Sequence, residues 1–266
     1  RWNDSDRVRN AANEFQFRND LDGALEIFQL ARKKTGDMNA YSLEMARLYS
    51  AQMKYAASMT EYLKTLEESP VSSPNIEYMI KNNTMARTQL PEFIGPLTNY
   101  LRTNPKSVKA AKLLAELKIR LGDYAGALAA YDEILSIAQI PDYRARILSQ
   151  AADTAWAYGD LDEAYVRMAE LVTGYPNADQ AYTALVKLVE GDQPVDERLR
   201  GLIDYRAKAY GPAVQAFYRL IQGDPDHDGE PHYYAGLSYL KAGSPELALD
   251  EFDVLVETHP DDRYVP

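Results

Sequence analysis

The chain has 266 residues, of which 46% are hydrophobic and 26% charged, a composition typical of a folded protein with a sizeable core. Its formal net charge of −11 argues against nucleic acid, whose phosphates require a basic face, and against adsorption to an anionic membrane. The absence of cysteine excludes disulfides, thiolate metal sites and cysteine nucleophiles. No apolar run approaches the ~20 residues that span a bilayer, so we expect no membrane insertion.

Small residues recur along the chain, each followed four positions later by a large apolar residue. The pairs are Ala24/Phe28, Ser58/Tyr62, Ala127/Tyr131, Ala164/Met168, Ala213/Phe217 and Ala248/Phe252, with a degenerate pair at Phe93/Leu97. Successive pairs lie 34 to 37 residues apart, except for one step of 49. This period and pattern resemble the tetratricopeptide repeat (TPR), a unit of two helices. The resemblance implies an all-α fold, a right-handed TPR superhelix of about seven helix-turn-helix units.

In chain order, residues 1–176 are predicted to form five such units. The turn inside a unit carries Gly or Asn followed by Asp or Ser, as at Asn19-Asp20, Gly122-Asp123, Gly159-Asp160 and Gly243-Ser244. Glycine can end the first helix with a positive φ, and Asp or Ser can cap the second. The third unit, at about 75–104, is degenerate: Lys81 replaces a small residue, and Gly95-Pro96 falls inside the second helix. We expect a distorted or kinked helix pair there.

The step of 49 residues leaves room for one more helix, which Ala178–Glu190 supplies. Residues 177–193 are therefore predicted to be an extra unpaired helix and its turn, and residues 194–266 two further TPR units. Arrays usually end in a capping helix with a polar outer face, and none follows the last unit at Pro266. We therefore expect an array that is truncated at its C-terminus, and an upstream segment before Arg1.

Acidic residues concentrate at the C-terminal end. Residues 222–266 hold eleven acidic and two basic residues, a net charge of −9, whereas the rest of the chain has a net charge of −2. We interpret this segment as a solvated acidic end that favours solubility. A docking surface for a basic partner is the alternative.

No pattern for catalysis or a cofactor is found: G-x-S-x-G, a phosphate-binding glycine loop and HExxH are all absent. We therefore predict no catalytic residue, no cofactor and no enzymatic activity. Residues 224–230 match the first half of a calcium loop, but Ala235 stands where a bidentate Glu is needed, so an acidic turn is the preferred interpretation over a weak cation site. His227 and His232 are five residues apart across a turn, a poor ligand spacing, and no metal site is predicted there or at His259.

The first helices of TPR units line an inner, concave face, where aromatic residues and Arg are typical anchors for a bound peptide. Inter-helix packing is the alternative role for each candidate. Arg9 and Asn13 match the opening pair of the carboxylate clamp in chaperone-binding TPRs, but Glu44 stands where the clamp needs Asn, so we do not expect that partner. The predicted partner-binding residues are Arg9, Asn13, Tyr78, Lys112, Trp156, Tyr205, Arg206 and Tyr233.

The last third of the chain carries a narrower resemblance. The runs that begin at Pro194-Val195-Asp196 and Tyr233-Tyr234-Ala235, and the final Tyr264-Val265-Pro266, are similar to runs in bacterial soluble lytic transglycosylases. In those proteins an α-superhelical region precedes a catalytic domain that cleaves peptidoglycan. The catalytic Glu-Ser motif of that domain has no counterpart here, because Glu68-Ser69 lies at a repeat boundary. No catalytic residue is therefore carried over.

That resemblance implies a bacterial cell-envelope protein that is periplasmic or extracytoplasmic. The leading hypothesis is a non-catalytic TPR scaffold that binds a protein or peptide, or a peptidoglycan-associated partner, and forms the helical region of a lytic transglycosylase-like protein. The alternative is a free-standing TPR adaptor in envelope assembly or secretion, with no enzyme attached.

Overall fold

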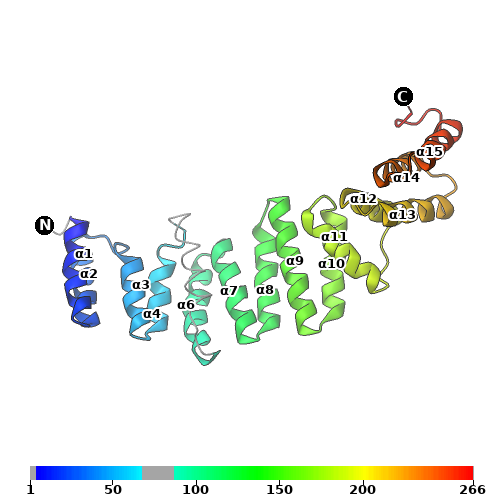
Figure 1. Ribbon diagram of the computed structural model, residues 1–266. Coiled ribbons are helices and arrows are strands. Elements are labelled where there is room, and N and C mark those ends of the chain that lie inside the picture. The colour runs from blue at the N-terminus through cyan, green and yellow to red at the C-terminus, as the bar shows by residue number, and fades with distance from the viewer. Residues whose placement is uncertain (1–3, 68–86, 266) are drawn as a thin grey trace. The chain divides into compact units, whose positions relative to one another are not determined.

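A computed structural model describes residues 4–67 and 87–265. The described residues form fourteen α-helices and one short 3-10 helix, with no strand, which confirms the expected all-α array (Figure 1). The chain divides into two compact units, unit 1 at Arg1–Ala138 and unit 2 at Gln139–Pro266. This boundary differs from the expected groups 1–176, 177–193 and 194–266, and that grouping of repeats stays a prediction.

Unit 1 consists of antiparallel helix pairs in which each second helix packs on the first. The pairs α1–α2, α3–α4 and α7–α8 form in this way, and α6 packs against both α4 and α7. Helix α6 continues through Gly95 and Pro96, although the sequence predicts a distorted helix there; the first helix of that predicted unit falls outside the described residues. The bounds are α1 (Ser5–Phe17), α2 (Leu21–Thr35), α3 (Ser42–Ala51), α4 (Tyr55–Leu63), η1 (Arg87–Gln89), α6 (Leu90–Thr103), α7 (Val108–Leu121) and α8 (Tyr124–Ile137).

Unit 2 repeats the pattern, with one helix that has no partner of its own. Helix α11 lies where the extra helix is expected and packs mainly on α10, between the pair α9–α10 and the pair α12–α13. No helix of the described residues is both long and apolar enough to cross a membrane. The bounds are α9 (Pro141–Tyr158), α10 (Leu161–Gly174), α11 (Asp179–Glu190), α12 (Glu197–Arg206), α13 (Tyr210–Gly223), α14 (Glu230–Ala242) and α15 (Pro245–Thr258).

The turns inside the pairs follow the sequence signals with one exception. Gly122, Gly159 and Gly243 have φ values of 84°, 89° and 85°, the left-handed conformation that glycine adopts most easily. Asp123 caps α8 by accepting a hydrogen bond from the Gly126 amide at 2.9 Å. The expected cap at Ser244 is wrong, since its side chain makes no capping hydrogen bond. There α15 begins with Pro245, whose ring fixes φ at a helical value.

Two glycines on first helices, Gly201 and Gly236, lie directly against large apolar residues on the second helices. A Cβ atom at Gly201 would lie 2.6 Å from the ring of Phe217, and one at Gly236 would lie 2.6 Å from the ring of Phe252. Each glycine on a first helix therefore makes room for the aromatic anchor on the second helix of its pair. Phe217 also stacks on Tyr234 of the next pair, with ring centroids 5.8 Å apart, so one side chain joins two successive pairs.

Candidate interaction sites

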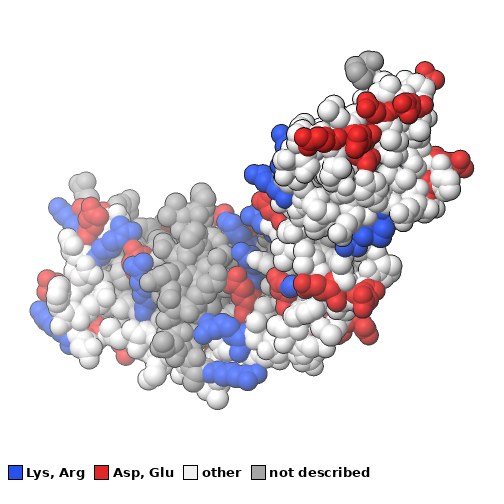
Figure 2. Space-filling model, turned by 45° about the vertical axis from the view of Figure 1, so that its right-hand side comes forward, with Lys and Arg blue, Asp and Glu red and all other residues white. Residues whose placement is uncertain are grey.

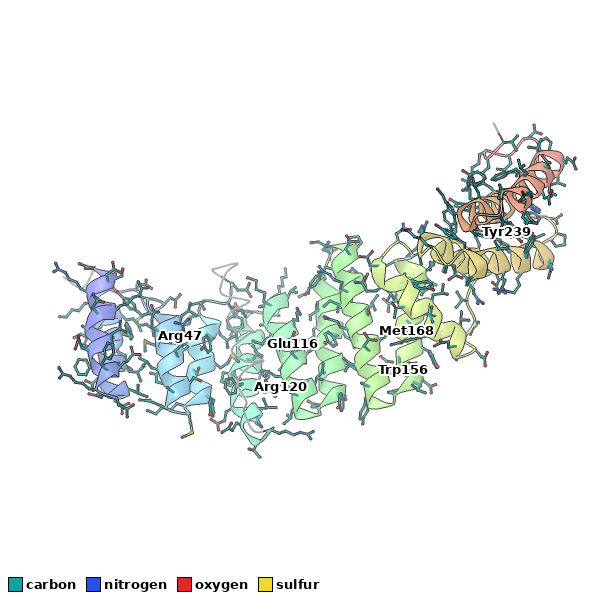
Figure 3. All side chains as sticks on the ribbon, viewed as in Figure 1. Arg47, Glu116, Arg120, Trp156, Met168 and Tyr239 are labelled. Atoms are coloured by element: carbon teal, nitrogen blue, oxygen red, sulfur yellow. The ribbon has the colours of Figure 1, made fainter. Side chains whose placement is uncertain are left out.

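Trp156 on α9 is the predicted anchor that the structure leaves most open among the aromatic ones it describes (Figure 3). Its side chain is 38% exposed, although three helices fix it in place. The Tyr165 ring of α10 meets it edge-on at 5.8 Å, and Lys187 Nζ of α11 lies 5.1 Å from its ring centroid. Lys187 also forms an ion pair with Asp153 at 2.9 Å. We call these four residues the Trp156 site.

An apolar groove begins at Tyr165. The Tyr165 side chain packs against Gly191: a Cβ atom added at Gly191 would lie 2.2 Å from the hydroxyl oxygen of Tyr165. Val166 in the groove wall is 62% exposed, and nearby along α10 Leu161 is 44% exposed. Exposed apolar side chains next to a fixed aromatic ring are typical of peptide-binding surfaces. The groove encloses about 280 Å³ and is lined by Asp162, Tyr165, Val166, Ala169, Leu188, Gln193 and Pro194.

Tyr205 and Tyr233 belong to one aromatic cluster in unit 2. The Tyr205 ring meets that of Tyr234 edge-on at 5.3 Å, and the Tyr233 ring lies 5.3 Å from the same Tyr234 ring. Tyr233 also stacks on Tyr264 at 4.3 Å with an interplanar angle of 15°. Both predicted anchors are thus partly buried by other rings, which favours the packing role over partner binding. Arg206 is exposed, and its guanidinium lies at hydrogen-bond distance, 3.5 Å, from the Pro176 carbonyl oxygen.

In unit 1, Arg9 is already engaged by its own chain. Its Nε donates a hydrogen bond to Glu44 Oε1 at 2.7 Å, and its guanidinium lies 5.7 Å from the centroid of the Tyr41 ring. The hydrogen bond to Glu44 raises the pKa of Arg9 above its ordinary value. Glu44 stands where a carboxylate clamp needs Asn. It therefore also pairs with the arginine that would bind the carboxylate of a partner.

Asn13 and Lys112, the other predicted residues of unit 1 that the structure describes, share no contact. Asn13 is exposed and accepts a hydrogen bond from Gln16 at 3.2 Å within α1. Lys112 is half-buried on α7. Tyr78 lies outside the described residues. The roles of these residues in partner binding stay predictions.

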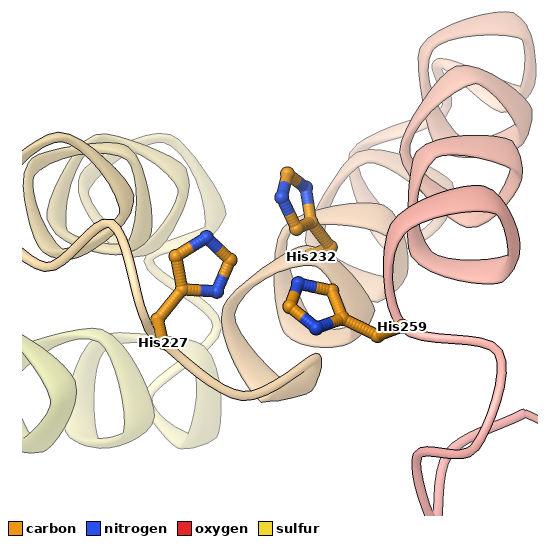
Figure 4. Close-up of side chains that lie close together, drawn as sticks. All are labelled: His227, His232 and His259. Atoms are coloured by element: carbon orange, nitrogen blue, oxygen red, sulfur yellow. The ribbon is translucent and has the colours of Figure 1, made fainter.

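The structure brings the three histidines together, which the sequence spacing did not predict. The ring centroids of His227 and His232 are 5.2 Å apart, those of His227 and His259 5.0 Å, and those of His232 and His259 6.2 Å (Figure 4). His259 lies far along the chain from His227 and His232, so sequence spacing alone does not place it beside them. The turn before α14, the first turn of α14 and the end of α15 meet at one end of an antiparallel pair. All three histidines lie at or next to helix ends that meet in this way, and their positions relative to the predicted helix ends could have identified the cluster.

His232 is linked to a buried polar network. Its Nδ1 lies 2.8 Å from Glu251 Oε2, and the other carboxylate oxygen of Glu251 accepts a hydrogen bond from the Tyr218 hydroxyl. Tyr239, labelled in Figure 3, donates in turn to Tyr218 at 3.4 Å. Burial, and secondarily the hydrogen bond to Glu251, raises the pKa of Tyr218, so its hydroxyl keeps the proton that it donates.

In the calcium-like run at 224–230, Asp228 and Glu230 are bound by an arginine of the same chain. Arg198 donates two hydrogen bonds to Asp228, at 2.9 and 3.1 Å, and a third to buried Glu230. The hydrogen bond from Arg198 holds the pKa of Asp228 below its usual value. This arrangement is that of an acidic turn paired with arginine, the preferred interpretation of the sequence. In the space-filling view, red and blue side chains meet at several places on the visible face (Figure 2).

A family model described as "Tetratricopeptide repeat" matches residues 232–262, which contain most of α14, all of α15 and the turn after it. A comparison with curated protein sequences gives no match. The helix pair α14–α15 is thus identified as a tetratricopeptide repeat.

Several solved structures are similar. A tetratricopeptide repeat protein from Parabacteroides merdae is 15% identical, with 95% of this chain and 92% of that chain covered and a TM-score of 0.35. A thermophilic TPR protein from Thermus thermophilus is 18% identical, with 68% and 99% covered and a TM-score of 0.36. YrrB, described as a TPR protein with an unusual peptide-binding site, is 15% identical, with 79% and 96% covered and a TM-score of 0.32. The described residues have the helix-pair fold of a TPR array, and residues 232–262 are identified as one of its repeats.

Proposed function

We propose that the chain is a non-catalytic scaffold that binds a protein partner through a peptide segment held at the Trp156 site. The observation that carries the proposal is an indole that contacts side chains of two neighbouring helices, Tyr165 of α10 and Lys187 of α11, and is still 38% exposed. A tryptophan held in this way loses little side-chain entropy when a partner covers it, which is the property of an interface anchor.

The surroundings of Trp156 define the class of partner. The groove beside Tyr165 offers apolar walls at Val166 and Leu188, and Lys187 and Asp153 supply polar groups beside the indole. A segment with one large apolar side chain for the groove and a polar backbone or side chain beside Lys187 fits this pattern. We propose a peptide of that kind, presented by a protein partner.

A selection from a random peptide library displayed on phage, with the whole chain as the target, tests the proposal. Synthetic versions of the selected peptides are then titrated against the Trp156→Ala variant, where we expect an affinity loss of about 30-fold, the effect of an interface hot spot of ~2 kcal/mol. Tyr158→Ala is the matched control, because Tyr158 is an exposed aromatic two residues away on the same helix. Equal binding by the Trp156 variant and the wild type would reject the site.

We further propose that this scaffold is the helical region of a lytic transglycosylase-like protein outside the cytoplasm of a bacterium. The support is the similarity of the runs at 194–205, 233–239 and 264–266 to that family. A free-standing TPR adaptor in envelope assembly or secretion is equally consistent with the array of helix pairs.

The full-length gene product separates these two proposals. If the longer protein carries a lysozyme-like domain and cleaves purified peptidoglycan while the present chain does not, the first is supported. A full-length protein without such a domain or activity would support the free-standing adaptor instead. Cleavage by the present chain alone would contradict the non-catalytic assignment.

A further inference from the structure

We propose that His227, His232 and His259 form a binding site for a zinc-class divalent metal ion, which joins the start of α14 to the end of α15. The three side chains come from the turn before α14, the first turn of α14 and the end of α15 (Figure 4). One ring nitrogen of each histidine lies within 4.8 Å of one ring nitrogen of the other two. The proposal is independent of the Trp156 site.

The hydrogen bonds of two rings determine which nitrogen can offer a lone pair to a metal. His232 Nδ1 lies 2.8 Å from a carboxylate oxygen of Glu251, and His227 Nδ1 lies 2.6 Å from the carbonyl oxygen of Asp228. Both oxygens are acceptors, so each Nδ1 must carry the proton and donate it. The lone pair of each neutral ring is therefore on Nε2. A carboxylate or carbonyl oxygen beside the other ring nitrogen is the usual partner of a metal-binding histidine.

Coordination requires only a modest closing of the three rings. Zn–N bonds of about 2.0–2.1 Å in a tetrahedral site place ligand nitrogens about 3.3 Å apart, so separations of up to 4.8 Å must shorten by about 1.5 Å at most. His227 lies in a turn and His259 is the residue that caps the end of α15, so both can make this adjustment by side-chain rotation. His232 is buried and held by Glu251, so it provides the fixed ligand.

The frame around the site is built by contacts that hold the two chain segments together. The Asp262 carboxylate accepts a hydrogen bond from the Gly229 amide at 3.0 Å, and Tyr264 donates one to Glu230 at 2.9 Å. These contacts bind the segment after α15 to the start of α14. Three neutral ligands leave both positive charges of the ion uncompensated, and the net charge of −9 on residues 222–266 offsets them.

The ligand set defines the metal class. Three imidazole nitrogens suit zinc, copper, nickel and cobalt, whereas calcium and magnesium require oxygen ligands. Three protein ligands also leave one position of a tetrahedral site for water. We therefore assign the site to a zinc-class ion and exclude the calcium-like run, whose Asp228 is bound by Arg198.

Isothermal titration of the whole chain, first treated with chelator, with zinc chloride tests the proposal. We expect one zinc ion per chain, and cobalt(II) to give the visible absorption of a four-coordinate site with three nitrogen ligands and one water. His227→Gln and His259→Gln should each weaken zinc binding by at least about tenfold, since even changes to residues that only support the ligands cost about 10–100-fold. Helix content by circular dichroism checks that both variants fold; neither residue lies inside a helix.

Glu251→Gln provides a readout that simple ring packing would not give. The glutamine amide can still accept the hydrogen bond from Tyr218, but its NH₂ group facing His232 would reverse the tautomer and place the proton on Nε2. Zinc affinity should fall about 10–100-fold while the fold is kept. Asp250→Asn is the matched control, because it removes one exposed carboxylate from the same helix and should leave the affinity unchanged.

Three outcomes would overturn the proposal. In the first, zinc still binds the triple variant His227→Gln, His232→Gln, His259→Gln, which would assign the ion to surface carboxylates. Displacement of zinc by millimolar calcium would point to oxygen ligands. No heat of binding and no cobalt spectrum with the folded wild-type chain would leave the histidines as a packed cluster only.

Discussion

Glu61 in unit 1 and Asp204 in unit 2 are both buried carboxylates, but their partners differ. In unit 1, the carboxylate of Glu61 is bound by Arg32 at 2.6 and 3.0 Å and by Lys64 at 2.8 Å. In unit 2, the nearest nitrogen that forms an ion pair with buried Asp204 is Arg200 Nε, at 3.9 Å. The same helix-pair architecture therefore holds one buried acid fully paired and another with a weak partner, and these two acids respond to pH in opposite directions.

The direction of each response follows from the pKa shifts. Burial alone would raise the pKa of Glu61, but hydrogen bonds from Arg32 and Lys64 outweigh it and lower that pKa below 4.5. Its stabilisation is present above pH 4.5 and is lost as the pH falls through the lowered value. Burial raises the pKa of Asp204 from 3.8 to about 6. Its contribution is complete below pH 3.8 and is lost as the pH rises through about 6.

The largest expected effect is loss of the buried Arg32–Glu61 ion pair in unit 1. Glu61→Ala leaves the Arg32 guanidinium buried without its counter-charge, which should cost unit 1 about 3–5 kcal/mol. Hydrogen exchange of the α2–α4 amides measures the loss locally. Glu26→Ala, an exposed change on α2, should stay within about 0.5 kcal/mol. A cost below about 1 kcal/mol at Glu61 would show that the buried pair is not needed.

The next largest effect concerns Asp204, the weakly paired buried carboxylate of unit 2. Asp204→Asn removes a carboxylate that is ionised at pH 7 against its environment, and a rise of its pKa from 3.8 to about 6 corresponds to at most about 3 kcal/mol. We expect slower exchange of the α12–α13 amides at pH 7, and a stability that no longer falls between about pH 4 and pH 6. Faster exchange in the variant at pH 7 would mean that Arg200 and Arg219 stabilise the charge fully.

A smaller effect tests the packing that both units share. Gly201→Ala places a Cβ atom 2.6 Å from the Phe217 ring and should cost about 1–3 kcal/mol by overpacking. Gly211→Ala, in the adjoining helix, meets no atom within 4 Å and should stabilise by up to about 1 kcal/mol. Local exchange in α12–α13 separates the two. The same sign for both variants would contradict the close packing of glycine on the aromatic anchor.

The smallest effects concern the helix caps. Asp123→Ala removes the hydrogen bond to Gly126 and should cost about 1 kcal/mol in α8. Ser244→Ala, where the equivalent side chain makes no cap bond, should cost less than half of that. Exchange rates of the first-turn amides of α8 and α15 provide the measurement, and equal costs would contradict the difference between the two turns.

Much of the fold could be predicted because the repeat specifies its packing in the sequence. The Ala213/Phe217 spacing identified a second helix, and the Gly122-Asp123 turn identified the end of a first helix and its cap. Ser244 failed as a cap because Pro245 fixes the start of α15 without a side-chain hydrogen bond. Helix α6 continues through Pro96 because burial of Phe93 and Leu97 in unit 1 outweighs the proline.

The sites were less predictable because they depend on contacts between helices. The repeat register placed Trp156 on the expected helix, but it could not show that Tyr165 and Lys187 hold the ring. Tyr205 shared the same register and lies in an aromatic cluster instead. The histidine cluster was missed because His259 is far along the chain from His227, and only antiparallel pairing brings both helix ends together.

The central claim is that unit 2 binds the partner, while the arginine proposed for unit 1 is held by Glu44. Titration of one selected peptide against the Trp156→Ala and Arg9→Ala variants tests this claim most directly. We expect the affinity to fall about 30-fold for Trp156→Ala and to change less than about threefold for Arg9→Ala. A larger loss for Arg9→Ala than for Trp156→Ala would contradict the account.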